Sequence, residues 1–446
     1  MSPQPALAAG GHAAAFDGSV DAGVVARQRD LPSLALLLDD EQLSRWLRQA
    51  GRLGAAETAQ VDRIRLKPGT RVQAAIRCGP DGTWLLAHGF TASSWSKGRK
   101  ELTVAQRRGH RALTCAQLRL VVTDMVADRD LRALAALRPD GRDGVRPESA
   151  ALAGLAASRW SPAAGPAGTA STLARTIGYN PARRWVGTLH PALPSEVDDR
   201  RGPAGPAVAV LKVHADADAG AIGSASRVAR RLAASGVATP EAVRIRGGMV
   251  MLPWVPGTPA DPMSGTDQDA VAELVSRLSW VRPRREVTAL PSLDHERIAD
   301  LVTVAVASLA AVDPVAGARA QQLAARLVPL LRGSGEDPVL VHGDLSSDQV
   351  VMGEQGPVLI DLDRAAAGPR GWDAASWMAA QAAMGTPAGQ VVPLPDLRVP
   401  SPLLAAAALV RTPEPWRRRR AGHAAATSAL LDLAQAALPG TTGRPW

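Results

Sequence analysis

Hydrophobic residues follow two different periods along the chain. Up to residue 257, short apolar runs alternate with Gly and Pro turns, as in "TWLLAHGF" (83–90) and "AVAVLKVHA" (207–215), and this pattern predicts β-strands. From 266 to 332 the apolar residues recur at helical spacing, most clearly in "IADLVTVAVASLAAV". A β-rich part followed by a helical part predicts an α+β fold with two lobes, a small β-rich lobe and a larger helical lobe.

Shorter elements are predicted between and after these regions. Residues 216–235 have a helical pattern that ends at Gly236. The stretch "VRIRGGMVMLPWVPG" (243–257) predicts a hairpin and a strand that runs into a Pro/Gly turn. Two short apolar runs, "PVLVHGD" and "PVLIDLD", predict two further strands, and the remainder to residue 437 is mostly helical.

The strand-rich part contains an approximate repeat. "RDLPSLALLLDD" (29–40) is echoed by "RDLRALAALRPD" (129–140), and "RLKPGTRVQAAIR" (65–77) resembles "GYNPARRWVGTL" (178–189). We interpret the echoes as the duplication of a small β-rich unit. The alternative is chance similarity within a composition of low diversity. Alignment of the apolar residues places Ala87 of the first copy against Lys212 of the second.

Composition divides the chain further. Residues 1–24 are rich in Ala, Gly and Ser and are predicted to be disordered. We expect an extra N-terminal α/β unit over 25–140, which we interpret as a degenerate copy of the small lobe. A linker rich in Pro, Gly and Ala follows over 141–170. The small lobe is then predicted over 171–257 and the large lobe over 258–440.

Charge and composition limit the functional classes. The chain has 446 residues, of which 46% are hydrophobic and 21% charged, as in a soluble globular protein. The net charge is +9, but the arginines are scattered and no zinc-finger, homeodomain or RNP-type motif is present. We therefore expect no nucleic-acid partner. An anionic nucleotide or phosphate ligand is a simpler reason for the positive excess.

Cysteine usage and apolar run lengths indicate the compartment. Cys78 and Cys115 have no metal-like spacing and no disulfide framework, which fits reduced thiols. The first residues lack the basic and apolar regions of a secretion signal. The longest apolar run, at 403–410, is far shorter than the roughly 20 residues that a membrane helix needs. The sequence predicts a cytoplasmic protein with no membrane association.

One contiguous stretch, "VHGDLSSDQVVMGEQGPVLIDLD" (341–363), contains the candidate chemistry. A predicted strand ends in His342-Gly343-Asp344, Gln349 follows five residues later, and a second strand ends at Asp361. Phosphoryl transfer from ATP uses one carboxylate to orient the acceptor hydroxyl, and a second carboxylate with an amide oxygen to hold Mg²⁺. An ordinary polar turn is the alternative interpretation.

These residues, with the later "GWDAASW", resemble the aminoglycoside phosphotransferase and choline kinase-like family of small-molecule kinases, which have a protein-kinase-like fold. The resemblance covers about 171–435. It implies that Asp344 is the catalytic Asp and that Gln349 and Asp361 bind Mg²⁺. Asp373 is expected to brace the exit of the second strand. The N-terminal extra unit and the Gln in place of Asn are similar to the maltokinase-like branch.

The same resemblance implies an ATP site upstream. "VAVLKVH" resembles the strand whose Lys contacts the nucleotide phosphates, "GYNPARR" (178–184) lies where the family has its nucleotide-covering loop, and "MLPWVPG" (251–257) resembles the hinge. The residues implied for the nucleotide are Lys212, Gly178, Arg184, Met251 and Trp254. Pro253 has no N–H group, so the hinge donor to adenine is expected from Trp254 or Val255.

Some candidates keep a second interpretation. Asp363 is a competing carboxylate on the same face as Asp361 if the strand continues, and Asp348 is a rival to Gln349. "RRRR" (417–420) is either an anion site or a solvated helix face. Trp372 and Trp377 either pack in the core or stack on a substrate ring, and Arg183, with Arg184, is a candidate to contact phosphate.

We expect an enzyme that transfers the γ-phosphoryl group of ATP, with Mg²⁺, to a hydroxyl of a small molecule such as an aminoglycoside, a sugar or an amino alcohol. The alternative is a non-catalytic nucleotide-binding regulator. Its motivation is that the predicted helix 216–235 contains no Glu to pair with Lys212, whereas kinases usually have one.

Overall fold

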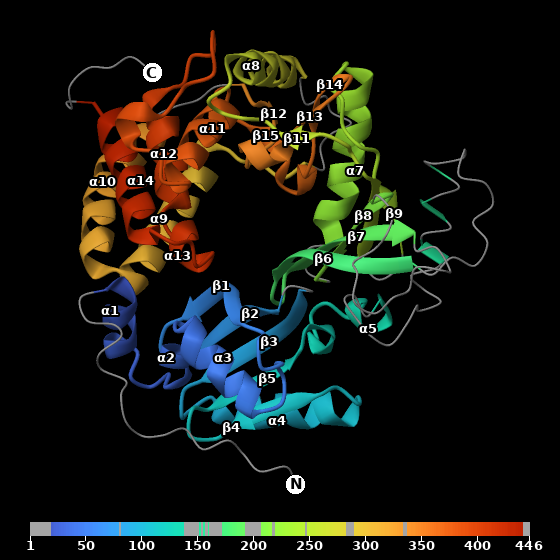
Figure 1. Ribbon diagram of the computed structural model, residues 1–446. Helices are drawn as coiled ribbons and strands as arrows, with labels where there is room; N and C mark the ends of the chain where they lie inside the picture. Colours follow the sequence, from blue (N-terminus) through green and yellow to red (C-terminus); the bar gives the residue numbers. More distant parts are fainter. Residues whose placement is uncertain are drawn as a thin grey trace. The chain divides into compact units, whose positions relative to one another are not determined.

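The computed structural model describes eight continuous ranges and five residues between 151 and 159; the ranges are 19–79, 82–137, 172–191, 207–215, 219–245, 248–281, 290–332 and 337–439. The chain forms two compact units. We call residues 1–219 with 243–254 the strand-rich unit, and residues 220–242 with 255–446 the helical unit. Figure 1 shows the elements of both units.

The strand-rich unit contains two five-stranded antiparallel sheets. The first has the order β1-β2-β3-β5-β4 and the second the order β6-β7-β8-β10-β9. The first sheet consists of β1 (Ala59–Lys67), β2 (Arg71–Cys78), β3 (Thr83–Phe90), β4 (Ala112–Cys115) and β5 (Leu120–Asp124). The second consists of β6 (Thr172–Asn180), β7 (Arg184–Pro191), β8 (Ala209–His214), β9 (Val243–Arg244) and β10 (Met249–Pro253). Counted along the chain, the two sheets have the same strand order.

Helices accompany the first sheet. Those before it are α1 (Val20–Arg27), α2 (Ser33–Leu37) and α3 (Asp40–Gln49), and α4 (Trp95–Arg107) follows β3. After β5 come η1 (Met125–Ala127) and α5 (Leu134–Leu137). The Ser44 hydroxyl of α3 donates to Ala59 O at 3.2 Å and accepts from Ala59 N–H at 2.8 Å, which joins α3 to the start of β1. α7 (Ala219–Ala234) follows the third strand of the second sheet, as α4 follows the third strand of the first.

The registers of the two sheets identify equivalent residues. The β1–β2 and β6–β7 hairpins both turn through a loop that begins with Pro. The third residue of β2, Gln73, lies opposite His88, and the third residue of β7, Val186, lies opposite Lys212. His88 therefore holds the place in the first sheet that Lys212 holds in the second. The alignment of Ala87 with Lys212 was wrong by one residue, because an apolar pattern alone does not fix a register.

The two faces of the second sheet have different environments. Leu211 and Val213 of β8 are fully buried in a core that also contains Trp185, Leu189 and Met251. Successive strand residues point to opposite faces, so Lys212 points away from this core. The apolar side chains on the core face fix which residues of β6, β7, β8 and β10 remain on the Lys212 face.

The helical unit is built around a large apolar core. Its helices are α7, α8 (Gly265–Trp280), α9 (His295–Val312), α10 (Pro314–Arg332), α11 (Trp372–Ala383), α12 (Ser401–Arg411), α13 (Glu414–Arg417) and α14 (His423–Ala437). Val228 and Leu232 of α7 pack in the same core as α8, α9 and α11. The side chains of Ser264 and Asp294 cap α8 and α9 by accepting N–H groups of their first turns. The N-cap signals and the apolar period agree with the three helices observed between 265 and 332; residues 282–289 of the predicted helical region lie outside the described residues.

Small sheets carry the motif between these helices. β12 (Val339–Val341) pairs antiparallel with β15 (Ala366–Gly368). β13 (Val350–Gly353) forms a hairpin with β14 (Gly356–Leu359), and β11 (Thr258–Pro259) pairs with β13. Three short 3₁₀ turns, η5 (Ser347–Gln349), η6 (Leu362–Arg364) and η7 (Ala388–Gln390), lie between these elements and the helices.

The α+β fold class is confirmed: both five-stranded sheets lie in the strand-rich unit, and the long helices of the later sequence lie in the helical unit. The proposed domain division stays a prediction. Residues 1–18 and most of the linker 141–170 lie outside the described residues, and α1 begins at Val20, inside the tail that was predicted to be disordered. Within the described part of the chain, every helix is too short or too polar to cross a membrane.

Candidate active site

The loop after β12 has a backbone conformation that only glycine adopts easily. Gly343 has φ of +85°, and a Cβ there would lie 2.3 Å from the carbonyl oxygen of Arg364. The buried β12 and the fully buried Leu345 hold the chain on either side of this turn. Asp344 is therefore presented from a fixed turn between two buried residues.

Asp373, in the first turn of α11, braces this turn. One carboxylate oxygen accepts the His342 N–H at 2.7 Å, and the other accepts the Gly343 N–H at 3.0 Å. Burial raises the pKa of Asp373 above its ordinary value, although both N–H groups stabilise the ionised form. The sequence prediction was therefore right that Asp373 braces a strand exit, but it chose the wrong strand: the braced exit is that of β12.

Hydrogen bonds connect the two halves of the motif. The His342 Nε2–H donates to Ile360 O at 2.9 Å, and the Ile360 N–H donates to Gln349 O at 2.9 Å. Ile360 directly precedes Asp361, so these bonds place Asp344, Gln349 and Asp361 on adjoining segments. His342 is 1% exposed, and its ring holds the loop against Ile360.

Gln349 and Asp361 each have a feature that is found at functional sites. The Gln349 Oε1 is buried and has no hydrogen-bond partner in the part of the chain that the structure describes. Asp361 has φ of +61°, a left-handed conformation that is uncommon for Asp and found often at functional sites. β14 ends at Leu359, so Asp363 does not continue a strand and lies instead in η6.

Two arginines that sequence reasoning missed contact Asp344. Arg411 of α12 lies 2.8 Å from one carboxylate oxygen, and Arg364 of η6 lies 3.3 Å from the other. Arg411 also donates to the backbone oxygen of Leu345 at 3.3 Å. Arg364 is three residues after Asp361, a spacing that the sequence did show. Arg411 is separated from the motif by α11 and most of α12, and no local sequence pattern distinguishes it.

On the strand-rich unit, the predicted nucleotide residues separate into two groups. Lys212, Gly178 and Arg184 belong to the face of the second sheet that points away from the core. Gly178 follows an irregularity in β6, and Lys212 is 6% exposed. Met251 is fully buried among the core residues of the opposite face. The Met251 side chain is therefore not on the Lys212 face, and the residues that replace it there are Val250 and Leu252.

The hinge prediction offered the backbone N–H of Trp254 or of Val255 as the donor to adenine, and the structure shows a hydrogen bond for the first of these. The backbone N–H of Trp254 donates to Val208 O at 3.2 Å, so that group is already used within the sheet. The Trp254 side chain is 41% exposed and lines a cavity of about 580 Å³. Trp254 thus contributes a ring surface, while its backbone N–H group does not face a ligand.

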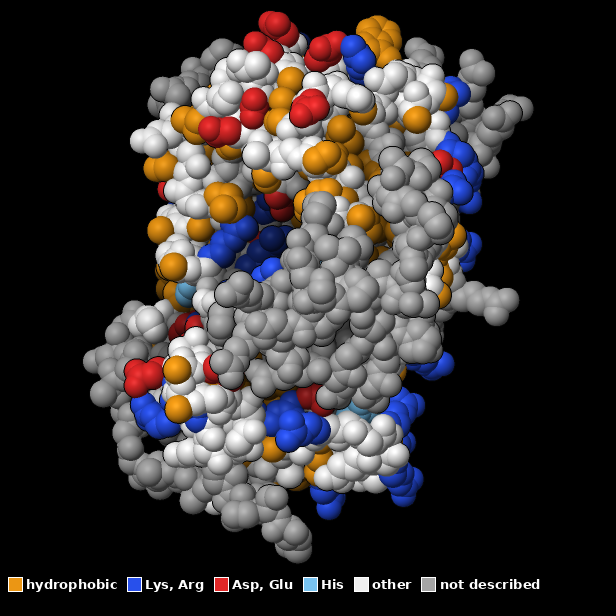
Figure 2. Space-filling view, turned by 45° about the vertical axis from the view of Figure 1, so that its right-hand side comes forward, with side chains coloured by type: hydrophobic (Ala, Val, Ile, Leu, Met, Phe, Trp, Pro, Cys, Tyr) orange, Lys and Arg blue, Asp and Glu red, His pale blue; other side chains and the backbone are white. Residues whose placement is uncertain are grey.

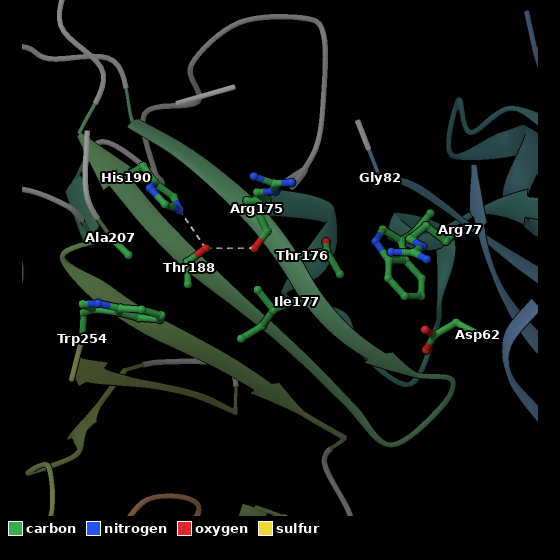
Figure 3. A pocket seen from close by; sticks show the side chains of 11 residues that line it. Asp62, Arg77, Gly82, Arg175, Thr176, Ile177, Thr188, His190, Ala207 and Trp254 are labelled. Carbon is green, nitrogen blue, oxygen red and sulfur yellow. Dashed lines mark hydrogen bonds between the residues drawn. The ribbon is translucent and has the colours of Figure 1, made fainter. Parts of the chain in front are cut away.

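This cavity lies along β6 and β7 (Figure 3). Ile177 and Trp254 turn apolar side chains toward it, and the Thr188 hydroxyl lies between them and His190. His190 Nε2 and Thr188 Oγ1 are 2.9 Å apart. Arg175 lines it from β6, and Arg77 comes from the first sheet. An apolar surface beside hydrogen-bonding and basic groups suits a flat, polar and anionic ligand.

Asp128, the residue that follows η1, fixes the β6–β7 hairpin, which precedes Lys212 in the chain. Asp128 Oδ2 accepts the Tyr179 hydroxyl at 2.8 Å and the Ala182 N–H at 2.8 Å. Its Oδ1 accepts the Asp130 N–H at 3.0 Å. Asp128 is 4% exposed, so all its hydrogen bonds form away from water. Sequence reasoning missed this residue, because its partners are distant in the chain.

The remaining candidates have ordinary environments. Trp372 and Trp377 are buried in the core of the helical unit. Arg417 and Arg418 both contact Glu414, at 3.5 and 3.4 Å. Asp348 is exposed and accepts the Ser346 hydroxyl at 2.5 Å, and Arg183 is exposed at the β6–β7 turn. Figure 2 shows that basic side chains on the visible face form several separate groups.

Comparisons with known proteins agree with the motif. Residues 196–397 match the phosphotransferase enzyme family, and no curated protein matches the chain. Among solved structures, the chain is similar to spectinomycin phosphotransferase in complex with ADP and spectinomycin, with 12% identity over 60% of this chain and 93% of that one, and a TM-score of 0.41. It is also similar to ethanolamine kinase from Plasmodium vivax, with 10% identity over 59% and 82% and a TM-score of 0.44. A mutant aminoglycoside phosphotransferase with ADP and hygromycin B gives 15% identity over 61% and 95%, with a TM-score of 0.39.

Proposed function

Because residues 196–397 belong to the phosphotransferase enzyme family, we propose that the chain transfers the γ-phosphoryl group of ATP to a hydroxyl group of a small molecule. The loop after β12 carries this proposal. There, Asp344, Gln349 and Asp361 lie on segments joined by the hydrogen bonds of His342 and Ile360. Phosphoryl transfer depends on such positioned oxygen groups more than on covalent chemistry.

Asp344 is the proposed base. Its carboxylate takes the proton of the acceptor hydroxyl while the hydroxyl oxygen forms a bond to the γ-phosphorus. The bond between that phosphorus and the bridging oxygen breaks, and ADP leaves with the electron pair. The Gly343 turn and the two N–H groups held by Asp373 fix the position of the Asp344 backbone.

Mg²⁺ is the metal that this chemistry implies, and the residues fit it. Gln349 offers a buried oxygen with no partner among the described residues, and Asp361 offers a carboxylate. Mg²⁺ usually binds through one or two carboxylates plus substrate phosphates, and no group of three or more His, Cys, Asp or Glu side chains is gathered for a metal among those residues. Gln349 and Asp361 would hold the ion, which neutralises charge on the ATP phosphates.

For the nucleotide, we propose that Lys212 contacts the phosphates and that the base lies against Ile177 and Trp254. Lys212 is buried, and it lies on the face of the second sheet that points away from the core. It is also the only Lys after residue 100 in an arginine-rich chain. The cavity beside Trp254 lies on the same face, toward the end of β10. Its size is within the range of small-molecule sites.

The test combines binding and turnover. We would measure nucleotide thermal shifts with Mg²⁺, and then ATP consumption with aminoglycosides, sugars and amino alcohols. Asp344→Asn is expected to reduce turnover by about 10²-fold or more. Glu354→Gln, in the exposed β13–β14 turn, is the control and is expected to keep activity. Unchanged turnover in Asp344→Asn would contradict the mechanism.

A second candidate function is a nucleotide-binding regulator without catalysis. It is favoured by one observation: α7, the helix after the Lys212 strand, contains neither Glu nor Asp. A nucleotide-induced thermal shift with no ATP consumption on any acceptor would support this function in place of the first.

A further inference from the structure

Arginines from three separate elements surround the loop that carries Asp344. Arg364 comes from η6, Arg411 from the end of α12, and Arg420 from the segment after α13. Arg364 and Arg411 share the single carboxylate of Asp344. Two guanidinium groups therefore contact one carboxylate, that of the proposed base.

The adjoining α13 repeats this arrangement. Arg417 and Arg418 share the single carboxylate of Glu414. Arg420 donates to the backbone oxygen of Ala383 at 3.0 Å and also contacts the sulfur of Met384. These two hydrogen-bond partners are neutral, and Arg420 is half-buried.

The charges are close enough to affect one another. Burial, followed by the charge of Arg418, lowers the pKa of Arg420, and Arg411 adds to the effect. Asp348 of the Asp344 loop and Glu414 oppose it. Arg420 and Arg411 therefore belong to one electrostatic group that includes the catalytic loop.

We propose that the phosphoryl acceptor bound beside Asp344 carries a negative group, such as a carboxylate, a phosphate or a sulfate, in addition to its hydroxyl. This inference rests on the proposed function, because that function assigns Asp344 to the acceptor. Guanidinium groups bind planar and tetrahedral anions through paired N–H donors, which suits this class of acceptor.

The opposite class of acceptor is disfavoured by the same charges. Like charges repel, and the repulsion is stronger in a partly buried site than in bulk water. An aminoglycoside or an amino alcohol would bring ammonium groups toward Arg364, Arg411 and Arg420. ATP itself is anionic, but its charge is assigned to Mg²⁺ and Lys212, whereas these arginines contact Asp344 and its neighbours.

The experiment uses acceptors that share one carbon skeleton and differ in charge. Glucuronate, glucose 6-phosphate, glucose and glucosamine are each titrated into the protein saturated with ADP and Mg²⁺, and the unfolding temperature is recorded. ATP consumption is measured with the same four compounds. We expect saturable stabilisation by the two anionic sugars, and weaker or no stabilisation by glucose and glucosamine.

Two arginine variants locate the effect. Arg420→Gln is expected to weaken binding of the anionic sugars about tenfold and to leave the ADP shift unchanged. Arg326→Gln is the matched control, since Arg326 also donates to a backbone oxygen, that of Pro439, at 2.8 Å. It is expected to bind all four compounds as the unaltered protein does.

The outcomes separate the two proposals. Equal stabilisation by all four sugars, no stabilisation by any of them, a preference for glucosamine, or an unchanged anion affinity in Arg420→Gln would overturn the anionic acceptor. Selective anion binding that Arg420→Gln weakens, without ATP consumption, would support the anion site and contradict the proposed catalysis. A change in ADP affinity of Arg420→Gln with unchanged sugar binding would assign Arg420 to the nucleotide and overturn the inference.

Discussion

Asp128 and Tyr179 form a buried hydrogen bond of 2.8 Å that ties the segment after the first sheet to the first hairpin of the second. Burial, followed by the Asp128 charge, raises the pKa of Tyr179 well above its ordinary value of 10.0. A group with a raised pKa contributes stability that is present below its unfolded pKa and is lost as pH rises. Since Tyr179 is the only Tyr in the chain, its ionisation can be followed by absorbance.

We predict that Tyr179→Phe lowers the free energy of unfolding by about 1–2 kcal/mol at neutral pH, because one buried hydrogen bond is lost. Above pH 10 the unaltered protein should lose stability more steeply than the variant, because only the unaltered protein has the Tyr proton to release on unfolding. Chemical denaturation between pH 7 and pH 11 measures both effects. Parallel pH profiles would show that the hydroxyl is not coupled to folding.

The Gly343 turn provides a second prediction. Gly343→Ala should lower both stability and turnover, because the added Cβ meets the Arg364 backbone oxygen at 2.3 Å and φ is +85°. Gly356→Ala is the matched control, with φ of +103° and no atom within 4 Å of its Cβ. In this control only the left-handed backbone conformation should lower the free energy of unfolding, by about 1–2 kcal/mol. The unfolding temperature and the rate of ATP consumption would be measured for both variants. Equal losses of stability and turnover would show that the contact between the added Cβ and Arg364 is not the cause.

A third prediction concerns the His88–Glu101 pair on β3 and α4. The atoms His88 Nδ1 and Glu101 Oε2 are 2.6 Å apart. Burial alone would raise the pKa of Glu101, but the hydrogen bond and charge of His88, with Arg129 and Arg71, outweigh it and hold the pKa below its ordinary value of 4.5.

A lowered pKa contributes stability that is present above the unfolded pKa and is lost as pH falls through the folded pKa. Below pH 4.5 the unaltered protein should therefore lose stability more steeply than Glu101→Gln. Urea unfolding from pH 6 to pH 3 checks this, with Glu41→Gln as an exposed control. Identical slopes for the unaltered protein and Glu101→Gln would contradict the pairing.

The register of the sheets supplies a fourth prediction. Lys212→Met should weaken nucleotide binding, because it removes the proposed phosphate contact and keeps the length of the side chain. His88→Met changes the equivalent position of the first sheet and should leave nucleotide affinity unchanged. Isothermal titration calorimetry with ADP in the presence of Mg²⁺ compares the nucleotide affinities of the two variants. Equal weakening in both would mean that the loss arises from stability and not from a contact with phosphate.

The candidate catalytic loop could be recognised in the sequence because its residues are contiguous and the chemistry proposed for it depends on their spacing. Arg411 and Asp128 were not, since each reaches its partner only after the chain has folded, and an isolated Arg or Asp has no distinguishing neighbours. The sequence indicated the position of Met251 along its strand but not the face on which its side chain lies, so its role at the nucleotide stays a prediction. Adjacent strand residues point in opposite directions, so an uncertainty of one residue reverses the assignment.

The equal strand orders of the two sheets have a consequence for the Lys–Glu pair of protein kinases, which joins the third strand to the following helix. The second sheet has the Lys on its third strand and a following helix without Glu, while the first has Glu101 on its helix and His88 on its strand. If one ancestral lobe gave rise to both, each copy has kept the member that the other has lost. Neither sheet with its helix would then preserve the ancestral Lys–Glu pair, and a chimera that joins β8 to α4 would restore it.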